Sequence, residues 1–211
     1  MQDCIVCSSN QIESFTTSDN LDYWQCNFCK TKFLDKKHYV DKSSEKKRYL
    51  EHKNIIEDEG YRTFLSKLVN PLKDKIELNA KGLDFGCGHG PALADMLKKD
   101  KYSIDLYDPF FFPNKEIFKK KYDFITCTET AEHFFSPKKE FDLINSLLNK
   151  GGWFGVMTSF LTTNEAFDSW YYRRDPTHVV FYAEETFDVI AKQRNWNCEI
   201  ITKDVVLFNK N

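Results

Sequence analysis

Short apolar runs alternate with amphipathic segments over the last two thirds of the chain. Apolar runs with the length of buried strands lie at residues 81–85, 103–107, 122–128 and 153–159. Helical spacing of apolar residues is found at 61–70 and 183–194, and a further helix is expected between Glu129 and Leu148. Two last runs, at 198–202 and 205–208, predict an antiparallel hairpin. This alternation predicts an α/β fold in which helices cover both faces of one sheet.

Charged, proline and glycine residues indicate where these elements are expected to begin and end. The charged stretch 41–59 predicts one helix, and the next helix is expected to stop at Asn70 because Pro71 follows it. The run 149–152 contains two glycines and is expected to break the chain before the strand at 153. These signals divide the chain into an N-terminal segment (1–38), a helical linker or cap (39–75) and a main domain (76–211).

Composition agrees with one α/β domain and a small appendage. The chain has 211 residues, of which 41% are hydrophobic and 16% aromatic, enough for a substantial core. The net charge of −2 gives no overall attraction to nucleic acid. A secretion signal and an apolar run of membrane-spanning length are both missing from the pattern, so we expect a cytoplasmic protein without membrane contact. The oligomeric state stays open.

A glycine-rich turn follows the first apolar strand of the main domain. Gly86, Gly88 and Gly90 stand at every second position, and Pro91 suits the first turn of the helix that follows. Glycine permits positive φ and lets the backbone approach a ligand closely. Asp108 ends the next strand, at a place where an acid can accept hydrogen bonds from ribose hydroxyls. The pattern predicts a nucleotide-type cofactor cradle made of Asp84, Gly86, Cys87, Gly88, Gly90 and Asp108.

The third glycine comes two residues after the second, whereas the dinucleotide fingerprint requires three. With Asp84 two residues before Gly86, this spacing resembles motif I of class I S-adenosylmethionine (SAM) dependent methyltransferases. Residues 76–211 resemble the core of that family. The combination of this motif with an N-terminal four-cysteine ribbon, YxxH at 49–52 and WYYRRDPTH at 170–178 resembles a group of small bacterial members. The resemblance implies a Rossmann-like methyltransferase sheet, SAM as cofactor and methyl transfer as the reaction.

The family's usual sheet has seven strands, but only the short stretch 109–122 separates Asp108 from Asp123. That length cannot hold a helix, a strand and a second helix, so we expect the third strand to be missing or reduced to a stub. The end of that strand normally helps to hold adenine. Pro109 and Phe110, together with the next two phenylalanines, follow Asp108 directly. They either give adenine an aromatic face or cover the bare edge of the sheet.

Two segments after strands carry the candidate catalytic groups. Glu129 comes first after the third predicted strand and is expected to contact the cofactor or take part in catalysis. In the segment after the fourth strand, His178 is the candidate base and Asp175 the residue that orients it, while Arg173 or Arg174 could clamp an anionic substrate. Alternatively, residues 175–177 form a turn and His178 bonds to backbone. Tyr49 and His52 share one helical face and either cover SAM, as the family implies, or lie in solvent.

Four cysteines near the start form two pairs, Cys4 with Cys7 and Cys26 with Cys29, and residues 8–25 lie between the pairs. This spacing predicts a zinc ribbon in which four thiolates close a tetrahedral shell, so that Zn²⁺ stabilises rather than catalyses. The alternative is coincidence or a redox pair.

We expect a methyltransferase that acts on a small polar acceptor, such as a sugar or a nucleotide-like molecule. Residues 30–53 contain nine Lys or Arg and four Asp or Glu, so RNA methylation by ribbon and basic helix is a second hypothesis. A third is a non-catalytic interaction protein that binds SAM and zinc.

Overall fold

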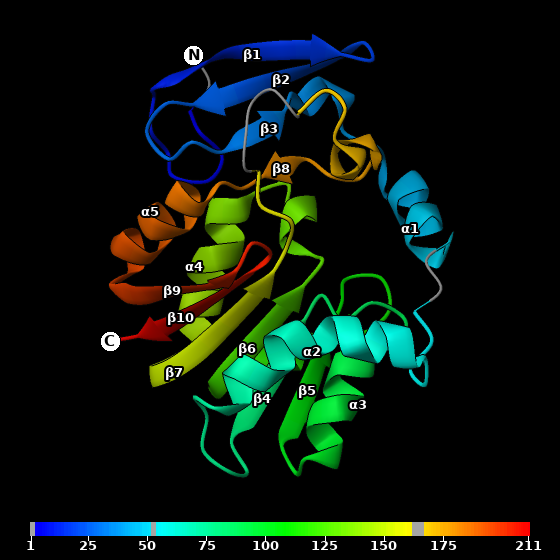
Figure 1. Ribbon diagram of the computed structural model, residues 1–211, viewed down its shortest axis with the longest axis vertical. Coiled ribbons are helices and arrows are strands. Elements are labelled where there is room, and N and C mark those ends of the chain that lie inside the picture. Colours follow the sequence, from blue (N-terminus) through cyan, green and yellow to red (C-terminus); the bar gives the residue numbers. More distant parts are fainter. Residues whose placement is uncertain (1–2, 52–53, 162–166) are drawn as a thin grey trace.

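Two sheets of unequal size form the framework of this computed structural model, which describes residues 3–51, 54–161 and 167–211 (Figure 1). The larger sheet has six strands in the order β5-β4-β6-β7-β10-β9. Its strands are β4 (Lys81–Phe85), β5 (Ser103–Tyr107), β6 (Tyr122–Thr128), β7 (Leu148–Met157), β9 (Trp196–Thr202) and β10 (Val205–Lys210). Strands β5, β4, β6 and β7 pair in parallel, and β10 runs antiparallel between β7 and β9. The carboxyl ends of the four parallel strands therefore open on one edge, toward the smaller sheet (Figure 1).

Helices cover both faces of the larger sheet, as predicted. The helices α2 (Glu59–Lys73) and α3 (Ala92–Lys99) lie on one face, and α4 (Pro137–Leu147) and α5 (Glu184–Arg194) on the other (Figure 1). Neighbouring residues of β6 show the two faces, because Phe124 is buried beneath α2 and α3 whereas Ile125 belongs to the core on the opposite side. Across the part of the chain that is described, every helix is too short or too polar to cross a membrane.

The expected loss of a strand after β5 is confirmed. Between β5 and β6 the chain forms only a single bridge, from Asp108 to Phe112, and the short 3-10 helix η2 (Lys115–Lys119). Phe118 of η2 packs against Tyr107 with ring centroids 4.7 Å apart. The edge of β5 is thus covered by η2.

The smaller sheet combines the N-terminal segment with a piece of the main domain. Strands β1 (Ile12–Ser18), β2 (Leu21–Cys26) and β3 (Lys32–Leu34) form an antiparallel meander, followed by the 3-10 helix η1 (Lys36–His38). The two-residue strand β8 (Val180–Phe181) pairs with β3 and was not predicted. Aromatic rings of Tyr23, Phe167 and Phe181 join the sheet to the rest of the core, with centroids 4.9 to 6.0 Å apart.

Several predicted ends of elements were wrong. Helix α1 (Lys42–Glu51) is shorter than the predicted 41–59, because the Asp58 carboxylate accepts a 2.6 Å hydrogen bond from the Tyr61 N–H and starts α2 separately. Helix α2 continues through Pro71, since burial of its last turn at Leu72 outweighs the local effect of proline.

The chain after Glu129 and the start of β7 also differ from expectation. A short turn, η3 (Ala131–His133), precedes α4, so the predicted helix starts late. Strand β7 begins at Leu148, before the glycines, and ends at Met157. Gly151 takes φ 75° with open space around it, which lets the strand continue through an irregularity.

Candidate active site

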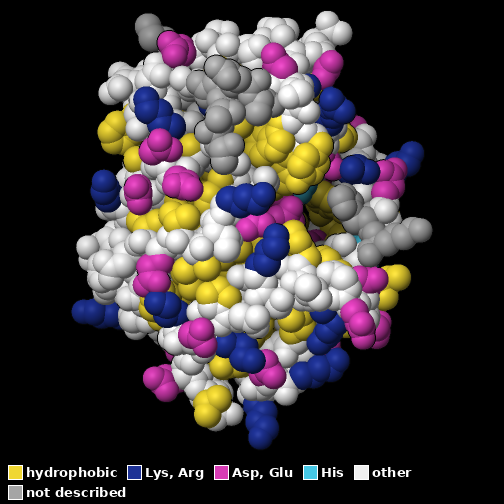
Figure 2. Space-filling model, in the orientation of Figure 1, with side chains coloured by type: hydrophobic (Ala, Val, Ile, Leu, Met, Phe, Trp, Pro, Cys, Tyr) yellow, Lys and Arg dark blue, Asp and Glu magenta, His cyan; other side chains and the backbone are white. Residues whose placement is uncertain are grey.

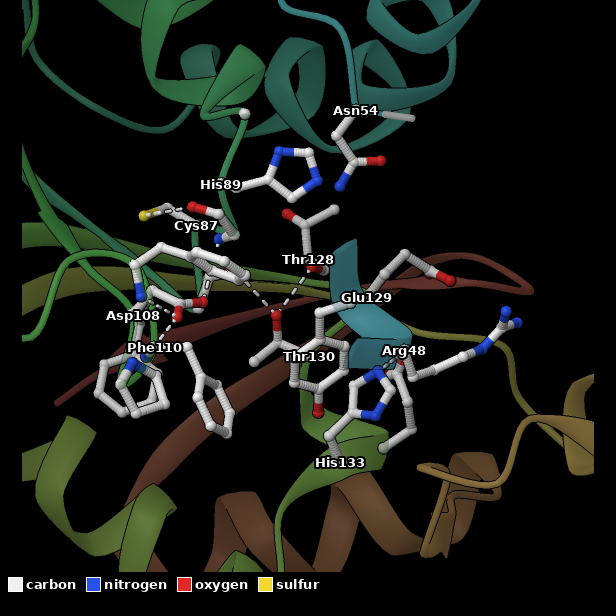
Figure 3. Close-up of a pocket in the computed structure, with 18 of the residues that line it drawn as sticks. Arg48, Asn54, Cys87, His89, Asp108, Phe110, Thr128, Glu129, Thr130 and His133 are labelled. Carbon is white, nitrogen blue, oxygen red and sulfur yellow. Dashed lines mark hydrogen bonds and ion pairs between the residues drawn. The ribbon is translucent and has the colours of Figure 1, made fainter. Parts of the chain in front are cut away.

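A cavity of about 800 Å³ opens at the carboxyl ends of β4, β5 and β6. Its walls come from the turn after β4, the residues after β5, residues 128–135, helix α1 and residues 171–178. Figure 2 shows a hollow on this face, bordered by hydrophobic and acidic side chains. In Figure 3, Cys87, His89 and Asp108 lie on one side of it, while His133 and Arg48 lie on the other. The parallel strands thus bring together groups that are far apart in sequence.

The glycine turn forms one wall, and its three glycines are needed for two different reasons. A Cβ on Gly86 would lie 2.2 Å from Thr130, and one on Gly90 would lie 1.9 Å from the carbonyl oxygen of Asn54. Gly88 has φ 63°, and a Cβ there would meet nothing closer than 3.8 Å. Gly86 and Gly90 are therefore needed for packing, whereas Gly88 leaves its space to the cavity.

Asp108 ties the end of β5 to this turn. Its Oδ2 accepts a hydrogen bond from the Gly88 N–H (3.1 Å), and its Oδ1 accepts from the N–H groups of Phe110 (2.8 Å) and Phe111 (3.0 Å). A carboxylate has about four acceptor sites, so these three bonds leave capacity for a ligand hydroxyl. Pro109, Phe110 and Phe111 line the cavity, while η2 covers the sheet edge.

Acidic groups concentrate around the cavity. Asp84 is buried and accepts a 2.9 Å hydrogen bond from the Thr126 hydroxyl, and burial raises the pKa of its carboxyl to about 7. Glu129 takes the left-handed backbone conformation, with φ 47°, which is uncommon for a residue other than glycine. Its side chain is open to the solvent of the cavity, yet the surrounding protein and the nearby Glu132 raise its pKa. A positively charged ligand would relieve these costs.

His178 lies on the opposite wall and is held by backbone. Its Nδ1 is 2.6 Å from the carbonyl oxygen of Tyr172, so Nδ1–H donates and the lone pair of the neutral ring is on Nε2. Burial, followed by the neighbouring His133, lowers the pKa of His178 to about 4. The sequence allowed His178 to be a base or to bond to backbone, and the structure contains the backbone hydrogen bond.

Asp175 has partners other than the His178 ring. Its Oδ2 accepts from Arg48 at 2.9 and 2.8 Å, and its Oδ1 accepts from the Thr177 N–H and hydroxyl at 3.0 and 2.5 Å. The hydrogen bonds to Thr177 and Arg48 outweigh burial and lower the pKa of Asp175 well below its usual range. Asp175 therefore orients Arg48 and fastens α1 to the far wall.

The other predicted residues of these segments separate into two groups. Arg173 is buried beside the smaller sheet, where its guanidinium contacts Asp19 at 2.6 Å, whereas Arg174 lines the cavity. Tyr49 also lines the cavity, with its ring 5.1 Å from His133. His52 lies outside the described residues.

The sequence did not predict the hydrogen bonds that orient this wall. Tyr172 O–H and Thr158 Oγ1 lie 2.9 Å apart, and the Thr158 hydroxyl donates to Glu132 Oε2 at 2.8 Å. All three side chains are buried. The available signal was the position of Thr158, which directly follows β7 and so lies at the same edge as Glu129.

The four N-terminal cysteines meet at one buried point. Cys4 Sγ and Cys29 Sγ are 3.7 Å apart, as are Cys7 Sγ and Cys26 Sγ, and all four sulfurs lie within 4.8 Å of one another. Sulfurs about 2.3 Å from a tetrahedral zinc ion are separated by about 3.8 Å. The donor set and its spacing fit Zn²⁺ with no position left for water.

Comparisons with known proteins identify the main domain. The family model described as a methyltransferase domain matches residues 58–200. No curated protein matched the chain. Among solved structures, the N-methyltransferase NodS from Bradyrhizobium japonicum in complex with S-adenosyl-L-homocysteine is similar with a TM-score of 0.49 and 14% identity over 79% of this chain and 97% of that one. A SAM-dependent methyltransferase from Methanosarcina mazei gives 0.48 and 11% over 66% and 96%. The YcgJ protein from Bacillus subtilis gives 0.48 and 16% over 64% and 70%.

Proposed function

Because this chain belongs to the methyltransferase domain family, we propose that its cavity binds SAM beside a small polar acceptor and transfers the methyl group between them. One observation carries the proposal. The glycine turn with Asp108 and the wall with Glu132, His133 and His178 face each other across a single cavity. Such an arrangement can hold two molecules with their reacting atoms close together, which is what an in-line displacement requires.

The donor side fits SAM in shape and charge. Gly88 leaves room for close approach of a ligand, and Asp108 retains acceptor sites for ribose hydroxyls. SAM carries a sulfonium and an ammonium group, which would favour the ionised forms of Asp84 and Glu129. The residues that we propose to surround SAM are Tyr49, Asp84, Gly86, Cys87, Gly88, Gly90, Asp108, Pro109, Phe110 and Glu129.

Adenine would be held by aromatic side chains in place of the missing strand. Phe110 and Phe111 border the cavity directly after Asp108, and the Phe110 ring is 5.6 Å from that of Tyr49. A base can stack on such faces with a gain of about 1–3 kcal/mol.

On the acceptor side, the neutral ring of His178 offers the Nε2 lone pair, and Arg174 brings a positive charge. Arg48 and Asp175 would close the wall by linking α1 to the segment after β7. We further propose that Cys4, Cys7, Cys26 and Cys29 bind Zn²⁺, which would stabilise the smaller sheet.

A matched pair of glycine variants tests the donor site. Gly88 and Gly151 both have positive φ, at 63° and 75°, so an alanine at either position bears a similar backbone strain. Of these two glycines, Gly88 lines the cavity and Gly151 does not. Calorimetry should show SAM binding weakened more than about 10-fold in Gly88→Ala and unchanged in Gly151→Ala. Equal SAM affinity in both variants would contradict the assignment.

Incubation with methyl-labelled SAM and fractionated cell extract tests the acceptor class. We expect label in small molecules. Label in RNA would favour the RNA hypothesis, and failure to bind SAM at all would refute the proposed function.

A further inference from the structure

Three potential metal-binding groups meet on the wall of the cavity opposite the glycine turn, which we call the acceptor wall. One donor atom each from Glu132, His133 and His178 lies within 4.8 Å of the other two. Glu132 and His178 are buried, and all three residues line the cavity. Two imidazoles and one carboxylate form a donor set that suits zinc, iron and related divalent ions.

Both histidines are fixed with their Nε2 lone pairs available. His133 Nδ1 lies 3.0 Å from the carbonyl oxygen of Thr177, and His178 Nδ1 lies 2.6 Å from that of Tyr172. A carbonyl oxygen accepts only, so each Nδ1 carries the proton. Histidines that bind metals commonly have this second contact, because it sets the tautomer and the direction of the ring.

The carboxylate has one satisfied oxygen and one that is not. Glu132 Oε2 accepts from the Thr158 hydroxyl, which is itself 2.9 Å from Tyr172 O–H. Among the residues that the structure describes, the buried Glu132 Oε1 has no hydrogen-bond partner, and its contact with His133 Nε2 at 3.9 Å exceeds hydrogen-bond length. An unsatisfied buried carboxylate oxygen is costly, and a cation between it and the two lone pairs would remove that cost.

We propose that Glu132, His133 and His178 bind a divalent transition-metal ion at this wall, separate from the four-cysteine site. Ligand atoms about 2.1 Å from a shared ion lie about 3.0–3.4 Å apart, so small side-chain rotations from the present spacing complete the site. Three protein ligands leave coordination positions open to the cavity, as in catalytic metal sites.

The open positions indicate the chemistry of the acceptor, a step that rests on the proposed function. A divalent ion favours an acceptor that presents a hydroxyl oxygen, preferably two neighbouring ones, and lowers the pKa of the bound hydroxyl. The hydroxyl proton passes to water. The oxygen electron pair then forms the bond to the methyl carbon while the methyl–sulfur bond breaks, leaving its electron pair on sulfur. The acceptor class is therefore an oxygen nucleophile.

Titration with Co²⁺ tests the site by absorption spectroscopy, using full-length protein that has its four-cysteine site loaded with zinc. Binding at the proposed site should produce d–d bands for one equivalent, without the thiolate charge-transfer band that cobalt at the cysteines would give. His133→Ala and His178→Ala should each weaken Co²⁺ binding by at least about 10–100-fold, the loss that follows removal of even an outer partner. His38→Ala is the matched control, because His38 lies on η1, bonded to Asp22, and should leave binding unchanged.

Absence of d–d bands in the unchanged protein would overturn the inference. So would a Co²⁺ affinity in both alanine variants equal to that of the unchanged protein. Glu132→Gln tests the third ligand in the same way. If this buried variant fails to fold, the variant at the less buried His133 still tests the site. SAM calorimetry on the same proteins separates the two proposals. SAM binding without cobalt binding overturns the metal site alone, whereas cobalt binding without SAM binding supports the metal site and refutes the proposed function.

Discussion

Replacing Asp108 with asparagine should loosen the donor side of the cavity by a predictable amount. The Asp108 carboxylate accepts three backbone hydrogen bonds, two at Oδ1 and one at Oδ2 from the Gly88 N–H. In Asp108→Asn the amide oxygen can keep the two bonds from Phe110 and Phe111, but the NH₂ group then faces the Gly88 N–H donor. At least one hydrogen bond to a charged acceptor is lost, which costs about 1.5–3 kcal/mol.

Two measurements separate the structural loss from the loss of ligand contact. Without SAM, the melting temperature should fall by roughly 3–12 °C, since each kcal/mol shifts a domain of this size by about 2–4 °C. If Asp108 also accepts from ribose, calorimetry should show SAM binding weakened by roughly 10- to 150-fold.

The control is Asp100→Asn, which removes an exposed contact with Lys73 worth at most about 1 kcal/mol. An Asp108→Asn protein with wild-type melting and wild-type SAM affinity would refute the reasoning altogether. Lower stability with unchanged SAM affinity would keep the tether and reject the ribose contact.

Three further outcomes follow from the buried groups. Cys26→Ser should lose one equivalent of zinc by elemental analysis and melt earlier; a zinc-free protein with unchanged melting would contradict the ribbon. Asp84→Asn should lose less stability than the native protein as pH rises. The folded pKa of Asp84 is raised to about 7 from 3.8, so its contribution to the free energy of unfolding is full below pH about 4 and is lost as pH rises to about 7, by roughly 4 kcal/mol in SAM-free urea unfolding. A wild-type pH slope in that variant would rule out Asp84 as its source. Thr158→Val should lower the free energy of unfolding by about 2–4 kcal/mol, since it removes the acceptor of Tyr172 O–H and the donor to Glu132 Oε2; an unchanged denaturation midpoint would show that this chain of hydroxyls contributes little.

The strands and the glycine turn were predictable because their signals are local. A short run of apolar residues suffices to mark β4, β5 and β6. The missing strand was also predictable, because the short interval from Asp108 to Asp123 sets a limit that no tertiary contact can change. Pro71 shows where local rules fail, since burial of Leu72 holds the last turn of α2 in helical form.

The partners of the site residues were beyond prediction because they come from distant parts of the chain. The sequence does not show which cationic side chain pairs with Asp175. In the structure the partner is Arg48, 127 positions earlier. Glu129 was correctly located after β6, but the carboxylate beside the histidines is Glu132, because η3 turns the chain between them. The pairing of β8 with β3 involves two residues of each strand, too few to leave a recognisable pattern.

Strand β8 begins two residues after His178 and completes the smaller sheet by pairing with β3. We therefore expect that the N-terminal segment cannot be removed, or replaced by that of another protein, without disturbing β8. A chain shortened to start at residue 39 would leave β8 unpaired and expose Phe181, producing a sticky strand edge next to the acceptor wall. Engineering of this protein therefore has to treat the cysteine segment and the wall that carries His178 as one unit. If the four cysteines bind Zn²⁺ as we propose, removal of the ion should disturb both.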